Sequence, residues 1–381
     1  METSVKMACQ QQRSGEHAMR VKISQLAQPV LLILLLVGLA NCGSEEPAQS
    51  AATQSAAVPT ASADANISAV VTSTNGPEAG TFISDALFLQ WQEDLSNWGR
   101  WGPDDELGAL NLITPQKRRE AAALVQAGVT VSLARNADTV ASVDNPCPIR
   151  WEMINATAGG ASDRINYECI HGAGTTHIDG FAHRFFGGKM WNGYPVADLV
   201  TLDDGALKNA VLTMKDGIVT RGVLYDIPKL KGVPYLEPGT RITIADLESW
   251  EEKTGVKAGA GDAMLLRWGR WARRDAVGAF DTWAEAAGFD NEVIPWLKQR
   301  DIAILGWETP GYTPRPEGDL PTLALHDFAL TMLGIHLIDR ADLEALSEMA
   351  ETLGRWEFML TIAPLPIPNG TGSPVNPIAM F

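Results

Sequence analysis

Three of the six histidines of this chain fall within thirteen residues, in the segment from His171 to His183. Asp179 stands between the second and third of them, two residues after His177. Imidazole and carboxylate side chains are the usual ligands of a catalytic zinc or manganese ion. On a strand, residues two apart point to the same face, so His177 and Asp179 can bind one ion together. Gly180 lets the chain turn before His183, which is then either a third ligand or a general base beside the metal.

A lone histidine is usually a packed or surface residue, so it is the grouping of these side chains that indicates a metal site. Local spacing does not complete a coordination sphere, because ligands distant in sequence usually close it. Two histidines lie far downstream, His326 and His336. A helix is expected directly after His326 and a short strand just before Asp339, so these two residues can meet at the ends of adjacent elements. His336 has no carboxylate partner at a suggestive spacing and is expected at the surface.

The composition is that of a soluble globular chain. Its 381 residues, 45% of them hydrophobic and 20% charged, allow one large domain or two small ones. A formal net charge of −16 argues against a nucleic-acid partner, since nucleic-acid binding favours a basic face. The four cysteines form no C-x-x-C motif, so a thiolate zinc site is not indicated. Cys147 and Cys169, the two cysteines of the folded part, can form one disulfide in an oxidising compartment.

Residues 1–42 have the pattern of a secretory signal. Arg20 and Lys22 precede a short apolar run, 29–40, that ends just before Cys42. The run is too short to span a bilayer, which takes about 20 residues. The segment resembles a bacterial lipoprotein signal, in which Cys42 becomes the lipidated first residue. A plain signal peptide or an uncleaved anchor is the alternative.

The stretch 43–80 is dominated by Ala, Ser, Thr, Gln and Pro. Such a composition buries too little apolar surface to offset the entropy lost on ordering, so a flexible linker is expected. Gly43 and Ser44 resemble the sorting signal of outer-membrane lipoproteins that face the periplasm. We therefore expect a periplasmic protein that contacts the membrane through its N-terminal lipid only, with secretion as the alternative.

Helical and strand patterns alternate over residues 81–381, which predicts a single α/β domain with a mixed β-sheet flanked by helices. Thr114 and Pro115 open a helix that is expected to run to Gly128, because threonine caps a helix and proline suits its first turn. Residues 364–377 are expected to form an irregular tail. The further predicted strands are 129–133, 210–214, 223–227, 263–268, 302–307 and 335–338, with 358–363, and the further helices are 245–253, 292–300, 327–333 and 341–353.

The run from Thr176 to His183, Thr-His-Ile-Asp-Gly-Phe-Ala-His, resembles the signature of the metal-dependent cyclase family, which includes kynurenine formamidase-like hydrolases. The resemblance covers most of residues 90–381 and follows the longer branch of that family. It implies a swivelling β/β/α fold and one or two divalent ions, Zn²⁺ or Mn²⁺. The supporting segments are 101–114, 188–193, 261–267 and 364–377.

The resemblance also implies roles for single residues. His177 and Asp179 match metal ligands, with Asp179 able to bridge two ions, and His183 matches the catalytic histidine. His326 matches a distant ligand of a second ion. Asp339 stands where the family usually has glutamate, and the shorter carboxylate can still bind a metal.

One position departs from the family pattern. A histidine usually stands four residues before His177, and this chain has Ala173 there. His171 lies two residues further upstream, and a bend of the glycine-containing loop between them would bring it to the metal. Otherwise another residue or water takes that place.

These residues predict an enzyme that cleaves the C–N bond of an amide, a formamide or a cyclic amide with metal-activated water. A lactone or ester hydrolase, or a cyclase running the reverse reaction, is the alternative with the same mechanism. The substrate is expected to be a small molecule, and Trp151, Trp191 and Trp307 are candidates for stacking on an aromatic one. A homodimer or tetramer is expected. The alternative of another class is a non-catalytic, lipid-tethered binding protein with a degenerate metal site.

Overall fold

The computed structural model describes residues 83–309 and 323–381. The predicted signal segment, the lipidation site at Cys42 and the linker 43–80 lie outside these residues. Within the described ranges, every helix is too short or too polar to cross a lipid bilayer.

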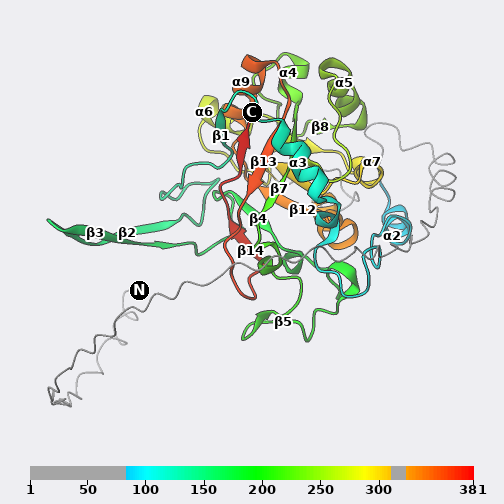
Figure 1. Cartoon of the computed structure of the whole chain (residues 1–381), viewed down its shortest axis with the longest axis horizontal. Coiled ribbons are helices and arrows are strands. Elements are labelled where there is room, and N and C mark those ends of the chain that lie inside the picture. The colour runs from blue at the N-terminus through cyan, green and yellow to red at the C-terminus, as the bar shows by residue number, and fades with distance from the viewer. Residues whose placement is uncertain (1–82, 310–322) are drawn as a thin grey trace, which may run out of the picture. The chain divides into compact units, whose positions relative to one another are not determined.

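A nine-stranded mixed sheet runs through the domain (Figure 1). The strands lie in the order β1 (Thr130–Ser132), β15 (Ile378–Met380), β13 (Glu357–Ile362), β7 (Ile218–Asp226), β9 (Ala263–Arg267), β11 (Ile304–Trp307), β12 (His336–Asp339), β4 (His177–Asp179) and β14 (Gly372–Pro374). β7, β9, β11 and β12 run parallel to one another, and the strands on both sides of them pair antiparallel. The predicted α/β class with a mixed sheet is confirmed.

The parallel strands are nearly continuous apolar runs because both faces of this part of the sheet are covered. β9 and β11 are buried at every position, as expected for parallel strands between two layers. Along β13, buried and half-buried residues alternate, which is the pattern of a strand with one face towards the core. The strand predictions at these places are confirmed, although β7 begins earlier than expected, at Ile218.

The helix predicted after Thr114 begins as expected. Thr114 accepts a hydrogen bond from the amide of Lys117 at the start of α3. The helix ends at Ala123 rather than Gly128, because the amide of Gly128 donates to the carbonyl of Phe381 and the chain turns into β1. The α-helices are α2 (Asp85–Asp94), α3 (Pro115–Ala123), α4 (Ile227–Lys231), α5 (Ile244–Thr254), α6 (Arg270–Val277), α7 (Val293–Arg300), α8 (Ala324–Phe328) and α9 (Glu344–Leu353), and shorter turns are η1 (Gly108–Leu112), η2 (Phe181–His183), η3 (Trp191–Gly193), η4 (Val211–Met214) and η5 (Ala329–Leu333).

Three other predictions are wrong because packing and strand pairing in the folded domain decide these positions. Residues 210–214 form the 3₁₀ turn η4 rather than a strand, since a buried turn needs the same apolar side chains as a buried strand. The tail 364–377 is not irregular throughout, because it contributes β14 to the edge of the sheet beside β4. His336, expected at the surface, is 1% exposed on β12.

A two-stranded ribbon projects from the body of the domain (Figure 1), and the sequence patterns did not predict it. Every residue of β2 (Arg150–Thr157) and β3 (Gly160–Asn166) is exposed, including Trp151. A disulfide between Cys147 and Cys169 closes the base of this ribbon, a pairing that the sequence allowed but left open. Two shorter strand pairs are β5 (Val200–Thr201) with β6 (Gly205–Ala206), and β8 (Arg241–Ile242) with β10 (Gly288–Phe289).

Candidate metal centre

Neighbouring strands bring the predicted ligands together. β4 carries His177 and Asp179 side by side, and its antiparallel pairing with β12 places Asp339 opposite His177. Both strands are fully buried at these positions. The remaining predicted site residues come from the chain before β4, the turn η2 after it and helix α8, and they are His171, His183 and His326.

The carboxylate of Asp179 lies at the centre of the cluster and has no exposed surface. Its Oδ1 is 2.7 Å from Nδ1 of His171 and 3.5 Å from Nε2 of His177. Its Oδ2 is 3.2 Å from Nε2 of His326 and 4.0 Å from Nε2 of His183. Each oxygen of this one carboxylate therefore faces two imidazoles.

Asp339 closes the cluster from the end of β12. Its Oδ2 lies 3.9 Å from Nε2 of His177 and 3.5 Å from Nε2 of His326. Its other oxygen, Oδ1, accepts a hydrogen bond from the indole of Trp307 on β11, which fixes the orientation of the carboxylate. The aspartate thus reaches the centre although the family usually has the longer glutamate.

The donor set fits a divalent cation. Two groups have their potential ligand atoms within 4.8 Å of one another, His171 with Asp179 and His183, and His177 with Asp179 and Asp339. Asp179 belongs to both, so the arrangement suits one ion or two ions bridged by its carboxylate. In the described part of the chain, Oδ2 of Asp179 is buried without a hydrogen bond, a cost that a bound cation would remove.

Further contacts orient the imidazoles of the cluster. Nδ1 of His177 donates to the carbonyl of Thr175 at 2.7 Å, which leaves the lone pair on Nε2 facing Asp179. Nδ1 of His326 lies 3.4 Å from the carboxylate of Asp327, which accepts hydrogen bonds of 2.6 and 2.9 Å from Arg184. Asp327 orients His326 and was not among the predicted site residues, although its place directly after His326 in the sequence could have indicated it.

The electrostatics describe a buried negative centre. Burial opposes the charge of Asp179, but the nearby imidazoles of His183, His171 and His326 hold its pKa well below the usual value. Burial also opposes protonation of His326, yet the nearby carboxylates of Asp179, Asp327 and Asp339 raise its pKa well above the usual value. Burial lowers the pKa of His183 to about 4, so this imidazole is neutral at neutral pH.

His336 lies behind the centre and supports β4. Its Nδ1 donates to the backbone carbonyl of Asp179 at 2.9 Å, and its ring stacks on Phe181 with centroids 3.9 Å apart. Burial lowers the pKa of His336 to about 4, so it stays neutral. The sequence did not indicate a partner for His336, because that partner is a main-chain carbonyl and not a carboxylate side chain.

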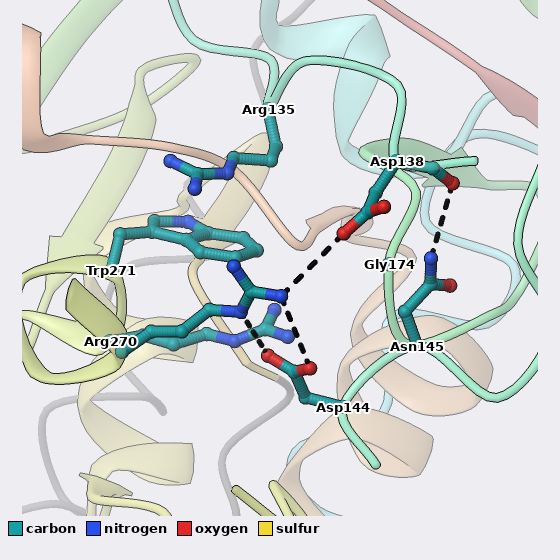
Figure 2. Close-up of a pocket in the computed structure, with 8 residues that line it drawn as sticks. Arg135, Asp138, Asp144, Asn145, Gly174, Arg270 and Trp271 are labelled. Atoms are coloured by element: carbon teal, nitrogen blue, oxygen red, sulfur yellow. Dashed lines mark hydrogen bonds and ion pairs between the residues drawn. The ribbon is translucent and has the colours of Figure 1, made fainter. Parts of the chain in front are cut away.

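Arg135, Arg270 and Trp271 form a cluster beside the loop that precedes β4 (Figure 2). The guanidinium groups of Arg135 and Arg270 lie 4.5 and 4.1 Å from the ring centroid of Trp271. Arg270 is fully buried and donates to the carbonyl of Ala173, while the amide of Arg135 donates to the hydroxyl of Thr176. The pocket among these residues has a volume of about 10 Å³, which suits one water molecule and not an organic substrate.

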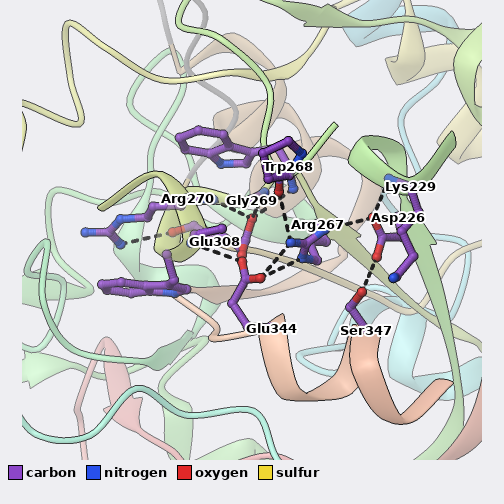
Figure 3. Close-up of polar contacts among 12 residues, drawn as sticks. Asp226, Lys229, Arg267, Trp268, Gly269, Arg270, Glu308, Glu344 and Ser347 are labelled. Carbon is purple, nitrogen blue, oxygen red and sulfur yellow. Dashed lines mark hydrogen bonds and ion pairs between the residues drawn. The ribbon is translucent and has the colours of Figure 1, made fainter. Parts of the chain in front are cut away.

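Charged residues at the carboxyl ends of the parallel strands anchor that cluster (Figure 3). Arg267 at the end of β9 pairs with Asp226 at 2.9 Å and with Glu344 at 2.6 Å. Glu308, directly after β11, accepts hydrogen bonds from three successive amides at the start of α6. The carboxylate thereby fixes the first turn of α6, from which Arg270 reaches the loop before β4.

None of the three tryptophans proposed to stack on a substrate lies exposed at the metal centre. Trp191 and Trp307 have no exposed surface, so neither offers a ring face to a substrate. Trp151 lies on the projecting ribbon, where its indole donates to Asp163 at 2.8 Å. Trp191 and Trp307 therefore serve core packing, whereas Trp151 belongs to the exposed ribbon.

The comparisons with known proteins identify the family of this chain. The family model described as "Putative cyclase" matches residues 94–314, which include the segment from His171 to His183. A crystal structure described as a novel cyclase is 32% identical, with 75% of this chain and 100% of that chain covered and a TM-score of 0.67. An isatin hydrolase bound to thioisatinate is 18% identical, with 70% and 98% covered and a TM-score of 0.48. Isatin hydrolase A from Labrenzia aggregata is 21% identical, with 68% and 94% covered and a TM-score of 0.47.

No curated protein matches the sequence. The family model nevertheless covers more than half of the chain, and the cyclase structure aligns along its whole length. This protein belongs to the cyclase family.

Proposed function

We propose that the protein is a metal-dependent hydrolase that cleaves the C–N bond of a small amide, formamide or cyclic amide. The observation that carries this proposal is the convergence of imidazoles and two carboxylates on one buried point, with a neutral histidine at its edge. The side chain of His183 is 22% exposed whereas that of His177 is 2% exposed, so a substrate approaches from the side of His183.

The centre would be held by His177, Asp179, His326 and Asp339, with His171 as a further candidate. A divalent cation bound there supplies Lewis acidity, which polarises a carbonyl group and lowers the pKa of water to about 7. The side chains of the protein orient the reactants and move the proton.

His183 serves as the base in this scheme. Its Nε2 accepts a proton from the attacking water as the new C–O bond forms at the carbonyl carbon. The C–N bond then breaks, and His183 returns the proton to the departing nitrogen. An open amide yields a carboxylic acid and an amine, and a cyclic amide yields a single ring-opened amino acid. The stacking of His183 on His171, with centroids 3.6 Å apart, holds the base in place.

An aryl formamide is the first substrate to test, because the sequence resembles the kynurenine formamidase-like branch. A lactone or ester would react at the same centre, with oxygen in place of nitrogen as the leaving atom. The purified protein should therefore be assayed on formamides, cyclic imides and lactones in both the hydrolytic and the cyclising direction. Hydrolysis of a C–N bond that is lost on chelation and restored by Zn²⁺ or Mn²⁺ is the expected result.

A non-catalytic binding protein is the competing proposal, motivated by Ala173 and Asp339, the two departures from the family pattern. Elemental analysis separates the two. Substoichiometric metal after supplementation with Zn²⁺ and Mn²⁺, together with no turnover of any substrate class, would favour the binding protein.

We also propose that the chain is a lipoprotein anchored to the outer membrane through Cys42 and facing the periplasm. Metabolic labelling with a fatty acid should mark the protein, and Cys42→Ser should abolish the label. A Cys42→Ser protein that still carries the label would exclude this residue as the anchor.

A further inference from the structure

The family pattern has a gap at Ala173 in this chain. The side chain of Ala173 is 9% exposed and its carbonyl accepts a hydrogen bond from Arg270, so the position is occupied by packing and cannot supply a ligand. The nearest histidine is His171, two residues upstream. Its imidazole is held at the centre by contacts with the C-terminal segment, at Thr371 and Gly372.

His171 already occupies a position at the carboxylate. Its Nδ1 is 2.7 Å from Oδ1 of Asp179, the oxygen that Nε2 of His177 also faces. The imidazole stands edge-on to His177, with centroids 5.3 Å apart, and lies flat on His183. The ring is thus confined on two sides by members of the cluster.

The C-terminal segment confines the ring on a third side. Nε2 of His171 lies 2.9 Å from the hydroxyl of Thr371. The next residue, Gly372, lies on β14 opposite Asp179, and a Cβ there would be 2.6 Å from Cε1 and 3.1 Å from Nε2 of His171, and 3.0 Å from the backbone carbonyl oxygen of Ile178. The imidazole therefore fills the space that any other side chain at position 372 would take.

We propose that Thr371 and Gly372 are positioning residues that make His171 a metal ligand through Nδ1, in place of the family histidine at position 173. Without a cation, Nδ1–H donates to Oδ1 of Asp179, because an ionised carboxylate can only accept. A cation at Oδ1 would take the place of that proton, and donation from Nε2–H to the hydroxyl of Thr371 would then favour the tautomer whose lone pair is on Nδ1. Gly372 has no side chain and so leaves free the space that the imidazole of His171 occupies. This inference rests on the proposed function only in that the centre binds a divalent cation.

The test measures the affinity of the full chain for Co²⁺ and Zn²⁺, by visible absorption and by chelator competition, without any assay of turnover. His171→Ala and Gly372→Ala should each weaken binding about 10- to 100-fold, the usual effect of losing a ligand or its support. Thr371→Val should weaken it in the same direction, and Thr371→Ser should restore it. Loss of His171 should also change the absorption bands of bound Co²⁺.

A double variant separates this role from a general effect on folding. If Gly372 acts only by seating His171, then His171→Ala/Gly372→Ala should bind no more weakly than His171→Ala alone. Gly259→Ala is the matched control, since a Cβ there would meet nothing closer than 4.0 Å. Circular dichroism of the metal-free forms shows that each variant is folded.

The outcomes are distinct. Parental affinity in His171→Ala, or additive losses in the double variant, would overturn the inference and leave the proposed function standing. Failure of the parent protein itself to bind a divalent cation would instead overturn the proposed function, and the inference with it.

Discussion

The two oxygens of Asp179 face different pairs of imidazoles, and this sets the chemistry of the whole centre. The carboxylate has no exposed surface, so its charge must be offset by its neighbours rather than by water. His171 and His177 lie at one oxygen, and His183 and His326 at the other. A substitution here should therefore change cation binding before it changes the fold.

Asp179→Asn is expected to weaken metal binding by about 100-fold, the upper end of the usual loss at a metal centre, and to abolish activity. The amide keeps the size of the side chain but removes the negative charge that the cation needs. Elemental analysis after dialysis against a defined free concentration of Zn²⁺ measures the effect. Asp163→Asn on the exposed ribbon is the control and should retain the parental occupancy. Full occupancy in Asp179→Asn would remove this residue from the centre.

His183→Ala is expected to keep the metal and to lower kcat by about 10² to 10⁴, the usual contribution of a general base. Its pKa of about 4 keeps the imidazole neutral and able to accept a proton over the whole neutral range. Steady-state kinetics together with metal analysis of the same sample test this. A near-parental kcat would show that another group moves the proton, and a loss of metal would make His183 a ligand.

At the scale of elements, the carboxyl ends of the parallel strands carry the charges that fix the loop before β4. Glu308 is one of these charges and has no exposed surface. Burial and the nearby Glu344 raise its pKa from 4.5 to about 8, against the opposing effect of Arg267. Its Oε1 makes no hydrogen bond in the described ranges, which leaves room for the proton.

The raised pKa of Glu308 predicts that stability falls as the pH rises. The folded state keeps this proton up to about pH 8, whereas the unfolded state releases it near pH 4.5. The stabilisation is therefore complete below pH 4.5 and is lost as the pH approaches 8. The melting temperature of the metal-free protein should fall between pH 5 and pH 8.

Glu308→Gln should flatten this dependence, because an amide stays neutral and still accepts the hydrogen bonds from the start of α6. Thermal unfolding followed by circular dichroism at pH 5, 6, 7 and 8 measures it, with the exposed Glu248→Gln as the control. An unchanged slope in Glu308→Gln would show that this carboxyl group is ionised in the folded state throughout.

At the scale of the whole molecule, one covalent link joins the base of the projecting ribbon to the chain that enters the metal centre. Cys169 is bonded to Cys147 and stands two residues before His171. The ribbon between the two cysteines is exposed along its whole length, so its own packing contributes little to holding that segment. The disulfide therefore limits how far the start of the loop can move.

Replacing both cysteines with serine should lower the free energy of unfolding by about 3 kcal/mol, the loss expected from the entropy of a loop of this length. The two cysteines are separated by 22 residues. Denaturant titration of the double variant and of the parent, each with and without reductant, measures the change. The reduced parent should match the variant, and equal stability of variant and oxidised parent would contradict the prediction.

Much of the site could be read from the residues themselves. The spacing of His177 and Asp179 places both on one face of a short strand, and the structure has that strand as β4. His326 and Asp339 were expected at the ends of adjacent elements, and the structure brings both to the same carboxylate. The strands of the parallel sheet were found because their apolar runs match the burial of both faces.

The sequence by itself thus determined the class of fold and the donor types at the centre, whereas the pairing of Cys147 with Cys169 was left open until the structure showed it. Only the tertiary structure decided that Thr371 and Gly372 seat His171, that Trp307 orients Asp339, and that His336 is buried behind β4. These contacts join residues far apart in the chain and depend on strand order and register. A linear pattern records which side chains are present, whereas the packing of the sheet sets which of them meet.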